Sequence, residues 1–434
     1  MKISEKNFNR IFNLFLFLIG TGIIFRIPST WLLLVFAAFN LLFYSKAVLI
    51  KKGLFVRILI VLPLLLELLF FFNSDSYFDE FKVLEKYASL ALFSWFIIGN
   101  YHRVFFVKLI EYYAIATTYI VFVLFLFFVV NNPDLIAKYQ SGVDLWEMGY
   151  VFCERIGMHA PALNMHMAFV TIICVYFISH SFKNNKKATL LAFRILTFII
   201  SFFLVLFINT RMALLNVIVG MGIIFFYSMR ERTNFKKTIK GALVSIVVLA
   251  AVLFVFVKND SYMTYKYKTV TFAYMDKVGK LDEIENPEAK IFNSFVTRVS
   301  IWKSVWDLSL ENLPFGVGAS NSKPELVAYY KLTNQQFLAK YEFPTHNQFL
   351  DYLLKYGILG PIVVLIYLLG FAYLGFDLKQ PVVVAFFFLF FSSNCVDDFL
   401  IRYDGIVFSG FWFAIFGSYW LQQKANPDKS LPIH

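Results

Sequence analysis

Charged residues are scarce in this sequence. They make up 16% of the 434 residues, whereas soluble domains carry about a quarter. Hydrophobic residues account for 59%, and the mean hydropathy is +0.67. A soluble globular domain does not carry this much apolar surface, so the composition excludes that class of protein.

Cysteines and cofactor motifs are equally sparse. The three cysteines, Cys153, Cys174 and Cys395, have neither the spacing of a zinc site nor that of a disulfide framework. The chain contains no GxGxxG fingerprint, Walker lysine or Asp-x-Asp motif of the kind that binds nucleotides or sugar nucleotides. No small-residue cleavage site of a secretory signal follows the first apolar run, so we expect residues 1–10 to belong to the mature protein.

What the sequence has instead is long apolar runs. Crossing the bilayer core takes about 20 apolar residues, and runs close to this length recur from end to end. They lack the apolar and polar alternation of a transmembrane β-barrel. We therefore predict an all-α polytopic membrane protein with about twelve transmembrane helices. The predicted spans cover residues 11–25, 31–45, 58–72, 82–99, 109–130, 162–181, 189–208, 212–228, 241–257, 347–374, 381–396 and 405–421.

Membrane topology explains the net charge of +12 better than a nucleic-acid-binding surface does. Lysine and arginine gather in alternate connections such as 46–57, 182–187 and 229–240, and not along one stripe. Connections rich in basic residues face the cytoplasm. This rule predicts that both termini are cytoplasmic. Because the basic residues lie in these connections and not on one surface stripe, we expect no nucleic acid to bind.

One connection is much longer than the others. Residues 258–345 contain eleven basic and ten acidic residues, and by the alternation they lie on the outer side. A loop of this length is uncommon unless it is functional or disordered, and its aromatic content argues against disorder. We therefore divide the chain into residues 1–257 with nine transmembrane helices, the outer loop 258–345, and residues 346–434 with three more helices and a short cytoplasmic tail.

The second half of this loop has a helical pattern. In SFVTRVSIWKSVWDLSL, the aromatic residues Phe295, Trp302 and Trp306 recur with Val299 at helical spacing. Tryptophan suits the headgroup region of a membrane. We predict an amphipathic helix over residues 294–310 at the outer interface, ended by the turn-forming LPFGVG segment.

Three polar side chains stand at the edges of apolar segments, where a charge costs at least about 2.5–3.5 kcal/mol. They are Arg211, Arg298 and His346. Each has a structural explanation, as a headgroup-facing arginine, a solvated charge or a satisfied histidine. Each also has a functional one, because guanidinium groups bind phosphate and a neutral imidazole takes a proton from a hydroxyl. The residues taken singly leave both explanations open.

Other polar residues accompany these three. Asn347 and Asp351 stand four apart, so they share a helix face and can orient a neighbour. His159 and His166 are seven apart, a poor spacing for ligands of one metal, so substrate contact or polar packing is the better hypothesis. Two further members of that cluster are Arg155 and Asn164, and the weaker candidates elsewhere are Glu67, Asp397 and Asp398.

The order of these signals resembles a known family. An NTRMALL hairpin with Arg211, a TRVSIWKSVWDLSLENLPFGVG segment with Arg298, and THNQFLDYLLKYGILG with His346 follow one another. This order resembles the O-antigen ligase and polymerase family of bacterial envelope glycosyltransferases. The likeness covers roughly residues 203–374, and the PALNMHMAF stretch is also similar. Thr210 departs from the family pattern, where serine is commoner.

The resemblance implies a GT-C-type glycosyltransferase of the bacterial inner membrane, with a periplasmic active site. Its substrates would be undecaprenyl diphosphate-linked oligosaccharide repeat units, and its partners membrane lipids and a chain-length regulator protein. His346 is then the predicted general base and Arg211 and Arg298 the diphosphate-binding residues of an inverting reaction without metal or other cofactor. The predicted supporting residues are Trp302, Asn347, Asp351, Arg155, His159 and Asn164.

Three functions fit this outline. We predict a polymerase of O-antigen or a related surface polysaccharide, which transfers the growing lipid-linked glycan onto a new lipid-linked repeat unit. A ligase that transfers the finished glycan to lipid A core is the alternative within the family. A lipid flippase or transporter is the alternative outside it, although the two halves of the chain show no repeat of the kind many transporters have.

Overall fold

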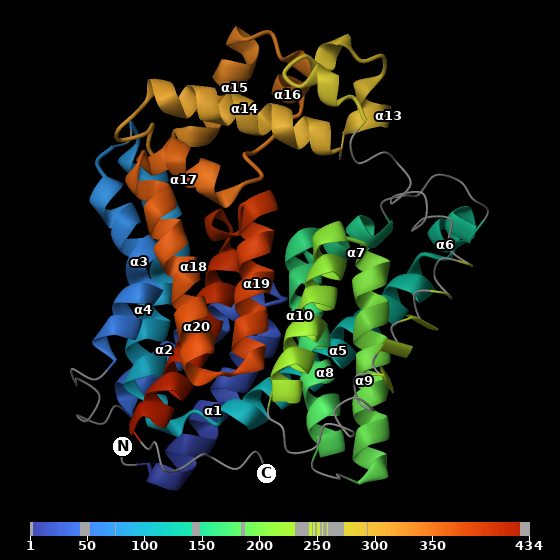
Figure 1. Cartoon of the computed structure of the whole chain (residues 1–434). Helices are drawn as coiled ribbons and strands as arrows, with labels where there is room; N and C mark the ends of the chain where they lie inside the picture. The colour runs from blue at the N-terminus through green and yellow to red at the C-terminus, as the bar shows by residue number, and fades with distance from the viewer. Residues whose placement is uncertain are drawn as a thin grey trace.

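The computed structural model describes residues 3–43, 53–73, 75–140, 148–183, 187–230, 273–292 and 294–425, with a few positions between 243 and 258. Within these ranges the protein is helical and has no strand. A bundle of long helices is capped at one end by a layer of short helices (Figure 1). The bundle contains α1 (Glu5–Gly22), α2 (Arg26–Leu42), α3 (Leu54–Phe70), α4 (Tyr77–Leu92), α5 (Phe106–Asn131), α8 (Ala160–Lys183), α9 (Ala188–Ile208), α10 (Arg211–Arg230), α18 (Leu359–Leu378), α19 (Pro381–Val396) and α20 (Tyr403–Ala425).

The cap is built from the predicted outer loop. Its longest helix, α14 (Phe295–Glu311), runs across the ends of the bundle helices (Figure 1). The other cap helices are α13 (Pro287–Ile291), α15 (Ser322–Leu332) and α16 (Gln336–Lys340). Short helices also occur in the connections: α6 (Pro133–Gln140), α7 (Met148–Ile156), α17 (Gln348–Tyr356), a π-helical turn Phe93–Ile97 after α4, and 3₁₀ turns Tyr101–Arg103, Met275–Lys277, Leu281–Glu283 and Phe399–Ile401.

Among the described helices, five are long and apolar enough to cross a membrane: α5, α8, α9, α10 and α18. Helix α8 is buried along its whole apolar window, so it is surrounded by protein rather than lipid. These helices agree with a polytopic membrane protein. The predicted ninth span, residues 241–257, lies mostly outside the described residues, and the total of twelve spans stays a prediction.

The bundle and the cap have separate hydrophobic cores. Helix α14 buries Val296, Ile301 and Val305 in the cap core, whereas Trp306 on its other face is 49% exposed. The predicted helix over residues 294–310 is therefore confirmed. Trp302 packs against the cap core, so of the two tryptophans only Trp306 is exposed, and the position of the helix at a membrane interface stays a prediction.

The predicted span 347–374 is not one helix. It is broken at Gly357 into α17 and α18, because this residue has φ +58° and ends α17. The LPFGVG turn of the cap docks against the break: Ile358 donates its N–H to the carbonyl of Pro314 (3.1 Å), and Val317 donates to the carbonyl of Leu354 (2.8 Å). The break thus joins the cap to the bundle.

Replacing Gly357 by alanine is expected to loosen this junction. A Cβ at Gly357 would collide with the carbonyl of Pro314, and the positive φ alone costs a non-glycine residue about 1–3 kcal/mol. The melting temperature of the purified protein in detergent should fall. Gly222→Ala is the matched control, since no atom lies within 4 Å of a Cβ built there, and its melting temperature should stay the same or rise slightly.

The start of α1 and the end of α20 lie at the same end of the bundle, away from the cap (Figure 1). This arrangement agrees with the predicted placement of both termini on one side of the membrane. Which side that is stays a prediction from the charge pattern.

Candidate active site

A cavity of about 270 Å³ lies where the cap meets the bundle. Its polar side includes Arg211, Arg298 and Asp397, and the rest is mostly apolar. An apolar wall with a few converging polar groups is typical of a ligand site. The lining residues come from α7, α8, α10, the start of α14 and the end of α19: Tyr150, Pro161, Met165, Thr210, Arg211, Met212, Ala213, Ser294, Phe295, Arg298, Ser393, Val396, Asp397 and Phe399.

The first turn of α10 forms one wall of this cavity. Helix α9 ends at Asn209 in the left-handed conformation, with φ 59°, so α10 begins directly at Arg211. Asn164 in α8 holds this corner, because its Nδ2 donates to Thr210 Oγ1 (2.7 Å) and to the carbonyl of Val205 (3.1 Å). The amino end of a helix carries partial positive charge, so α10 and the guanidinium of Arg211 both favour an anion here.

Arg298 reaches the same cavity from the cap. It lies in the first turn of α14, which begins after the N-cap residue Ser294. Its Nη1 donates to the carbonyl of Val396 at 2.9 Å, so the half-buried guanidinium is tied to the end of α19. The structure thus brings together two arginines that stand 87 positions apart in the sequence.

His346 lies next to Asp397, one of the residues that line this cavity, and two other segments hold it in place. Its carbonyl accepts from Trp302 Nε1 (3.1 Å), and its backbone N–H donates to Asp398 Oδ2 (3.2 Å). Its ring Nδ1 lies 3.4 Å from Asp397 Oδ1, and the side chain is 20% exposed. With Nδ1–H directed at the carboxylate, Nε2 carries the lone pair that can accept a proton.

The acids beside His346 differ in their ionisation. Burial opposes the charge of Asp397, but the hydrogen bond with His346 and the positive charge of Arg402 outweigh it and lower the pKa of Asp397. Burial raises the pKa of Asp398 to about 6, and the negative charge of Asp397 adds to that shift. Asp397 is therefore the carboxylate that stabilises a protonated His346.

His159 lies close to the same group. Burial lowers its pKa to about 4, and the charge of Arg402 lowers it further, so the imidazole is neutral at neutral pH. The fields of Asp397, His346 and Arg298 also act on it. The predicted supporting residue His159 thus lies near His346 and Arg298.

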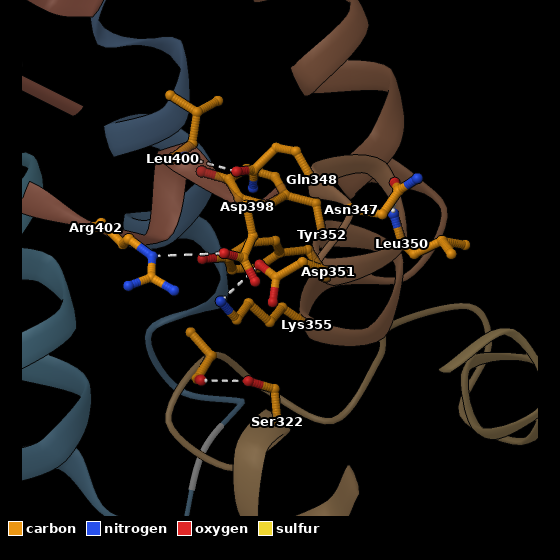
Figure 2. Close-up of polar contacts among 12 residues, drawn as sticks. Ser322, Asn347, Gln348, Leu350, Asp351, Tyr352, Lys355, Asp398, Leu400 and Arg402 are labelled. Atoms are coloured by element: carbon orange, nitrogen blue, oxygen red, sulfur yellow. Dashed lines mark hydrogen bonds and ion pairs between the residues drawn. The ribbon is translucent and has the colours of Figure 1, made fainter. Parts of the chain in front are cut away.

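The other predicted supporting residues have different contacts. Asn347 is the N-cap of α17, since its Oδ1 accepts from the N–H groups of Phe349 (3.0 Å) and Leu350 (3.1 Å), and its Nδ2 donates to the carbonyl of Cys395 (2.9 Å). Asp351 pairs with Lys355 at 2.7 Å (Figure 2). Arg155 is exposed on α7. Among the described residues, the carboxylate that contacts the His346 ring is Asp397 and not Asp351.

The segment after α19 supplies contacts that sequence reasoning undervalued. Asp397 and Asp398 were only weak candidates, and Arg402 and Gln348 were not candidates. Gln348 Oε1 accepts from the N–H of Leu400 (2.6 Å), and Arg402 Nε lies 3.6 Å from Asp398 Oδ1 (Figure 2). A sequence signal could have identified Asp397, Asp398 and Arg402. Residues 397–404 place three acids and one arginine between two apolar helices, where charges are costly.

His346, Asp397 and Asp398 also have the proximity of metal ligands. Their ligand atoms lie within 4.8 Å of one another. Two of the oxygens are directed at N–H donors, however: Asp397 Oδ1 accepts from the N–H of Asp398 (2.9 Å), and Asp398 Oδ2 accepts from the N–H of His346 (3.2 Å). Asp398 Oδ1 is buried and has no hydrogen-bond partner among the described residues; it faces Arg402 Nε at 3.6 Å. A metal-independent reaction stays a prediction.

Replacing Asp397 by asparagine is expected to slow turnover about ten- to hundredfold. The change keeps a hydrogen-bond acceptor beside His346 but removes the negative charge that stabilises the imidazolium formed when the ring takes up a proton. The rate of glycan transfer by the purified variant, compared with donor binding, checks this. A fall in donor affinity with an unchanged maximal rate would contradict the assignment.

Comparisons with known proteins bear on the family of this part of the chain, residues 196–365. No curated protein matches the chain in sequence. A family model described as O-antigen ligase (Wzy_C) matches residues 196–365, a segment that contains Arg211, Arg298 and His346. Residues 196–365 are therefore similar to an O-antigen ligase domain, in agreement with the family that the motifs resemble.

Proposed function

We propose that this protein is a polymerase of O-antigen or a related surface polysaccharide. A hydroxyl of a new lipid-linked repeat unit attacks the anomeric carbon of the growing glycan. The bond between that carbon and the diphosphate oxygen breaks as the new glycosidic bond forms, and undecaprenyl diphosphate leaves. Direct displacement inverts the anomeric centre.

The cavity beside α10 is the observation that carries this proposal. Arg211, Arg298 and the amino end of α10 meet there, in a mostly apolar wall. Guanidinium forks and helix amino ends bind phosphate oxygens, and preorganised donors stabilise charge as it develops on a leaving group. A lipid-linked diphosphate matches both the charge and the apolar lining.

His346 is the proposed general base. Its ring contacts Asp397, which itself lines the cavity, so proton removal and leaving-group stabilisation occur side by side. The acceptor proton moves to Nε2 of the imidazole, and the resulting positive charge faces the Asp397 carboxylate. Trp302 and Asp398 keep the ring in place through the His346 backbone.

The proposal includes a location and an architecture. We place the protein in the bacterial inner membrane with about twelve spans of GT-C type, the cap and the cavity on the periplasmic side, and both termini in the cytoplasm. Support comes from the five apolar helices, the positive clusters between spans and the family match. The expected partners are membrane lipids and a chain-length regulator protein.

Ligation is the second candidate, favoured by the description of the matched family model. Purified protein incubated with lipid-linked repeat units alone separates the two reactions. A ladder of lipid-linked polymer is the result expected for a polymerase. Product that appears only after lipid A core is added would replace this proposal with ligation, and repeat units that merely change leaflet would replace it with flipping.

A further inference from the structure

A second group of cations lies outside the cavity, where the segment after Asp398 meets α2 and α4. Thr30 in α2 donates to the hydroxyl of Tyr403 (3.1 Å), and Tyr87 in α4 donates to the carbonyl of Leu400 (2.7 Å). The members of this group are Arg402 in the turn before α20, Arg26 at the start of α2 and Lys86 in α4. None of them lines the cavity that holds the first two arginines. Arg402 connects this second group to His346, because Asp398 faces Arg402 and also accepts from the His346 N–H.

Arg402 presents its guanidinium end outward from Asp398. Its Nε faces Asp398 Oδ1 at 3.6 Å, and its two terminal nitrogens point away from that carboxylate (Figure 2). The side chain is 32% exposed, and those nitrogens make no hydrogen bond to any residue that the structure describes. Two parallel N–H groups held in this way match the oxygens of a phosphate.

Arg26 and Lys86 extend this positive surface. Arg26 is exposed and Lys86 half-buried, and over the described ranges neither side chain forms an ion pair or hydrogen bond. The field of Arg26 acts on Lys86 and on Asp404, and that of Arg402 also acts on Asp404. Asp404, together with Asp398 beside Arg402, offsets at most two of the three positive charges.

Other charged groups near Lys86 have partners of their own. Lys355 and Asp351 act on Lys86, but they form a buried pair with each other at 2.7 Å, so their charges cancel. Glu67 is fully buried and accepts a hydrogen bond from Tyr356. The cations that can meet a ligand are therefore Arg402, Arg26 and Lys86.

Helix α2 also offers an apolar surface next to Arg26. Ile27 is 72% exposed and Trp31 67% exposed. Such side chains suit the acyl region and headgroup boundary of a bilayer. An anion bound by these cations can therefore remain attached to a lipid tail in the membrane.

We propose that Arg402, Arg26 and Lys86 bind the diphosphate of the acceptor, a second lipid-linked saccharide. This inference rests on the proposed function, since polymerisation joins two saccharides that each carry a lipid diphosphate. The growing chain occupies the cavity with Arg211 and Arg298, and the new repeat unit approaches from the side of Arg402. His346 and Asp397 lie between the two diphosphates.

The test compares two acceptors with one donor, using the full chain in lipid nanodiscs. The donor is a lipid-linked repeat unit whose own acceptor hydroxyl is blocked. One acceptor is the repeat saccharide on a short alkyl diphosphate, and the other is the same saccharide as a neutral alkyl glycoside. Wild-type protein should prefer the diphosphate acceptor in kcat/KM by about ten- to hundredfold, the range for hydrogen bonds to a charged group.

Substitutions in the second cation group should reduce this preference. The double variant Arg26→Gln with Lys86→Gln is expected to raise KM for the diphosphate acceptor and leave the neutral acceptor unchanged. Arg402 also contacts the Asp398 carboxylate beside His346, so Arg402→Gln should slow both acceptors but lower kcat/KM for the diphosphate acceptor more. Arg298→Gln should slow both acceptors equally, because it acts on the donor. Should Arg402→Gln fail to fold, the double variant still tests the acceptor site, because neither Arg26 nor Lys86 contacts Asp398 within the described residues.

Three outcomes would overturn the inference. Equal use of both acceptors by wild-type protein would leave the polymerase standing and remove the second diphosphate site. If the double variant slowed transfer to both acceptors equally, Arg26 and Lys86 would act on folding or on the general base and not on the acceptor diphosphate. Transfer to lipid A core without any transfer to the repeat-unit acceptors would instead remove the proposed function itself.

Discussion

Replacing His346 by alanine is expected to lower the turnover of glycan transfer about 10²- to 10⁴-fold, the usual contribution of a positioned general base. The ring lies beside Asp397, and the backbone is tied by Trp302 and Asp398, so the imidazole is fixed before substrate arrives. Alanine leaves the acceptor hydroxyl without a proton acceptor. Initial rates of polymer formation with purified lipid-linked repeat units measure the effect.

His346→Gln is the companion variant. Glutamine keeps a polar group at this position but cannot take up a proton at neutral pH. It should therefore be nearly as slow as the alanine variant, with an unchanged melting temperature. A glutamine variant that retains more than about a tenth of the wild-type rate would assign His346 to positioning and not to proton transfer.

Replacing Arg211 or Arg298 by glutamine is expected to lower turnover by about 10²- to 10³-fold each, the range for losing one preorganised donor to a developing anion. Both side chains line one cavity, so the double variant should lose less than the product of the single effects. Lysine at either position should restore part of the rate, since it returns the charge without the fork. Initial rates at saturating donor measure this.

Lys303 supplies the matched control for Arg298. It lies on the same helix, α14, but is exposed and does not line the cavity. Lys303→Gln should transfer glycan at the wild-type rate. A loss as large as that of Arg298→Gln would mean that general positive charge on the cap, and not the cavity, is what the reaction requires.

The sequence predicted the helices of this protein better than it predicted the contacts between them. Apolar runs and the spacing of Phe295, Trp302 and Trp306 predicted helices, because helix formation depends on local periodicity. From the sequence, Gly357 could be interpreted as a close-packing or kink position in a continuing helix, but not as a break. The cause of the break is a distant segment, since the Pro314 carbonyl approaches so closely that only glycine fits. A long-range contact of this kind leaves no local pattern.

The candidate site shows the same division. Arg211, Arg298 and His346 could be singled out, because charges at membrane edges are costly and therefore informative. That the two arginines line one cavity, and that Asp397 contacts the histidine, depends on packing between α10, α14 and the end of α19. Asp351 looked equally suitable by spacing, but it pairs with Lys355 one turn along its own helix.

Donor binding and turnover, measured side by side, test the central claim most directly. The account assigns proton transfer to His346 and diphosphate binding to Arg211 and Arg298. His346→Ala should bind labelled lipid-linked repeat unit within about twofold of wild type while forming no ladder, and the double variant Arg211→Gln with Arg298→Gln should bind it at least about tenfold more weakly. Normal donor binding by the double arginine variant, or lost binding by His346→Ala, would contradict the account.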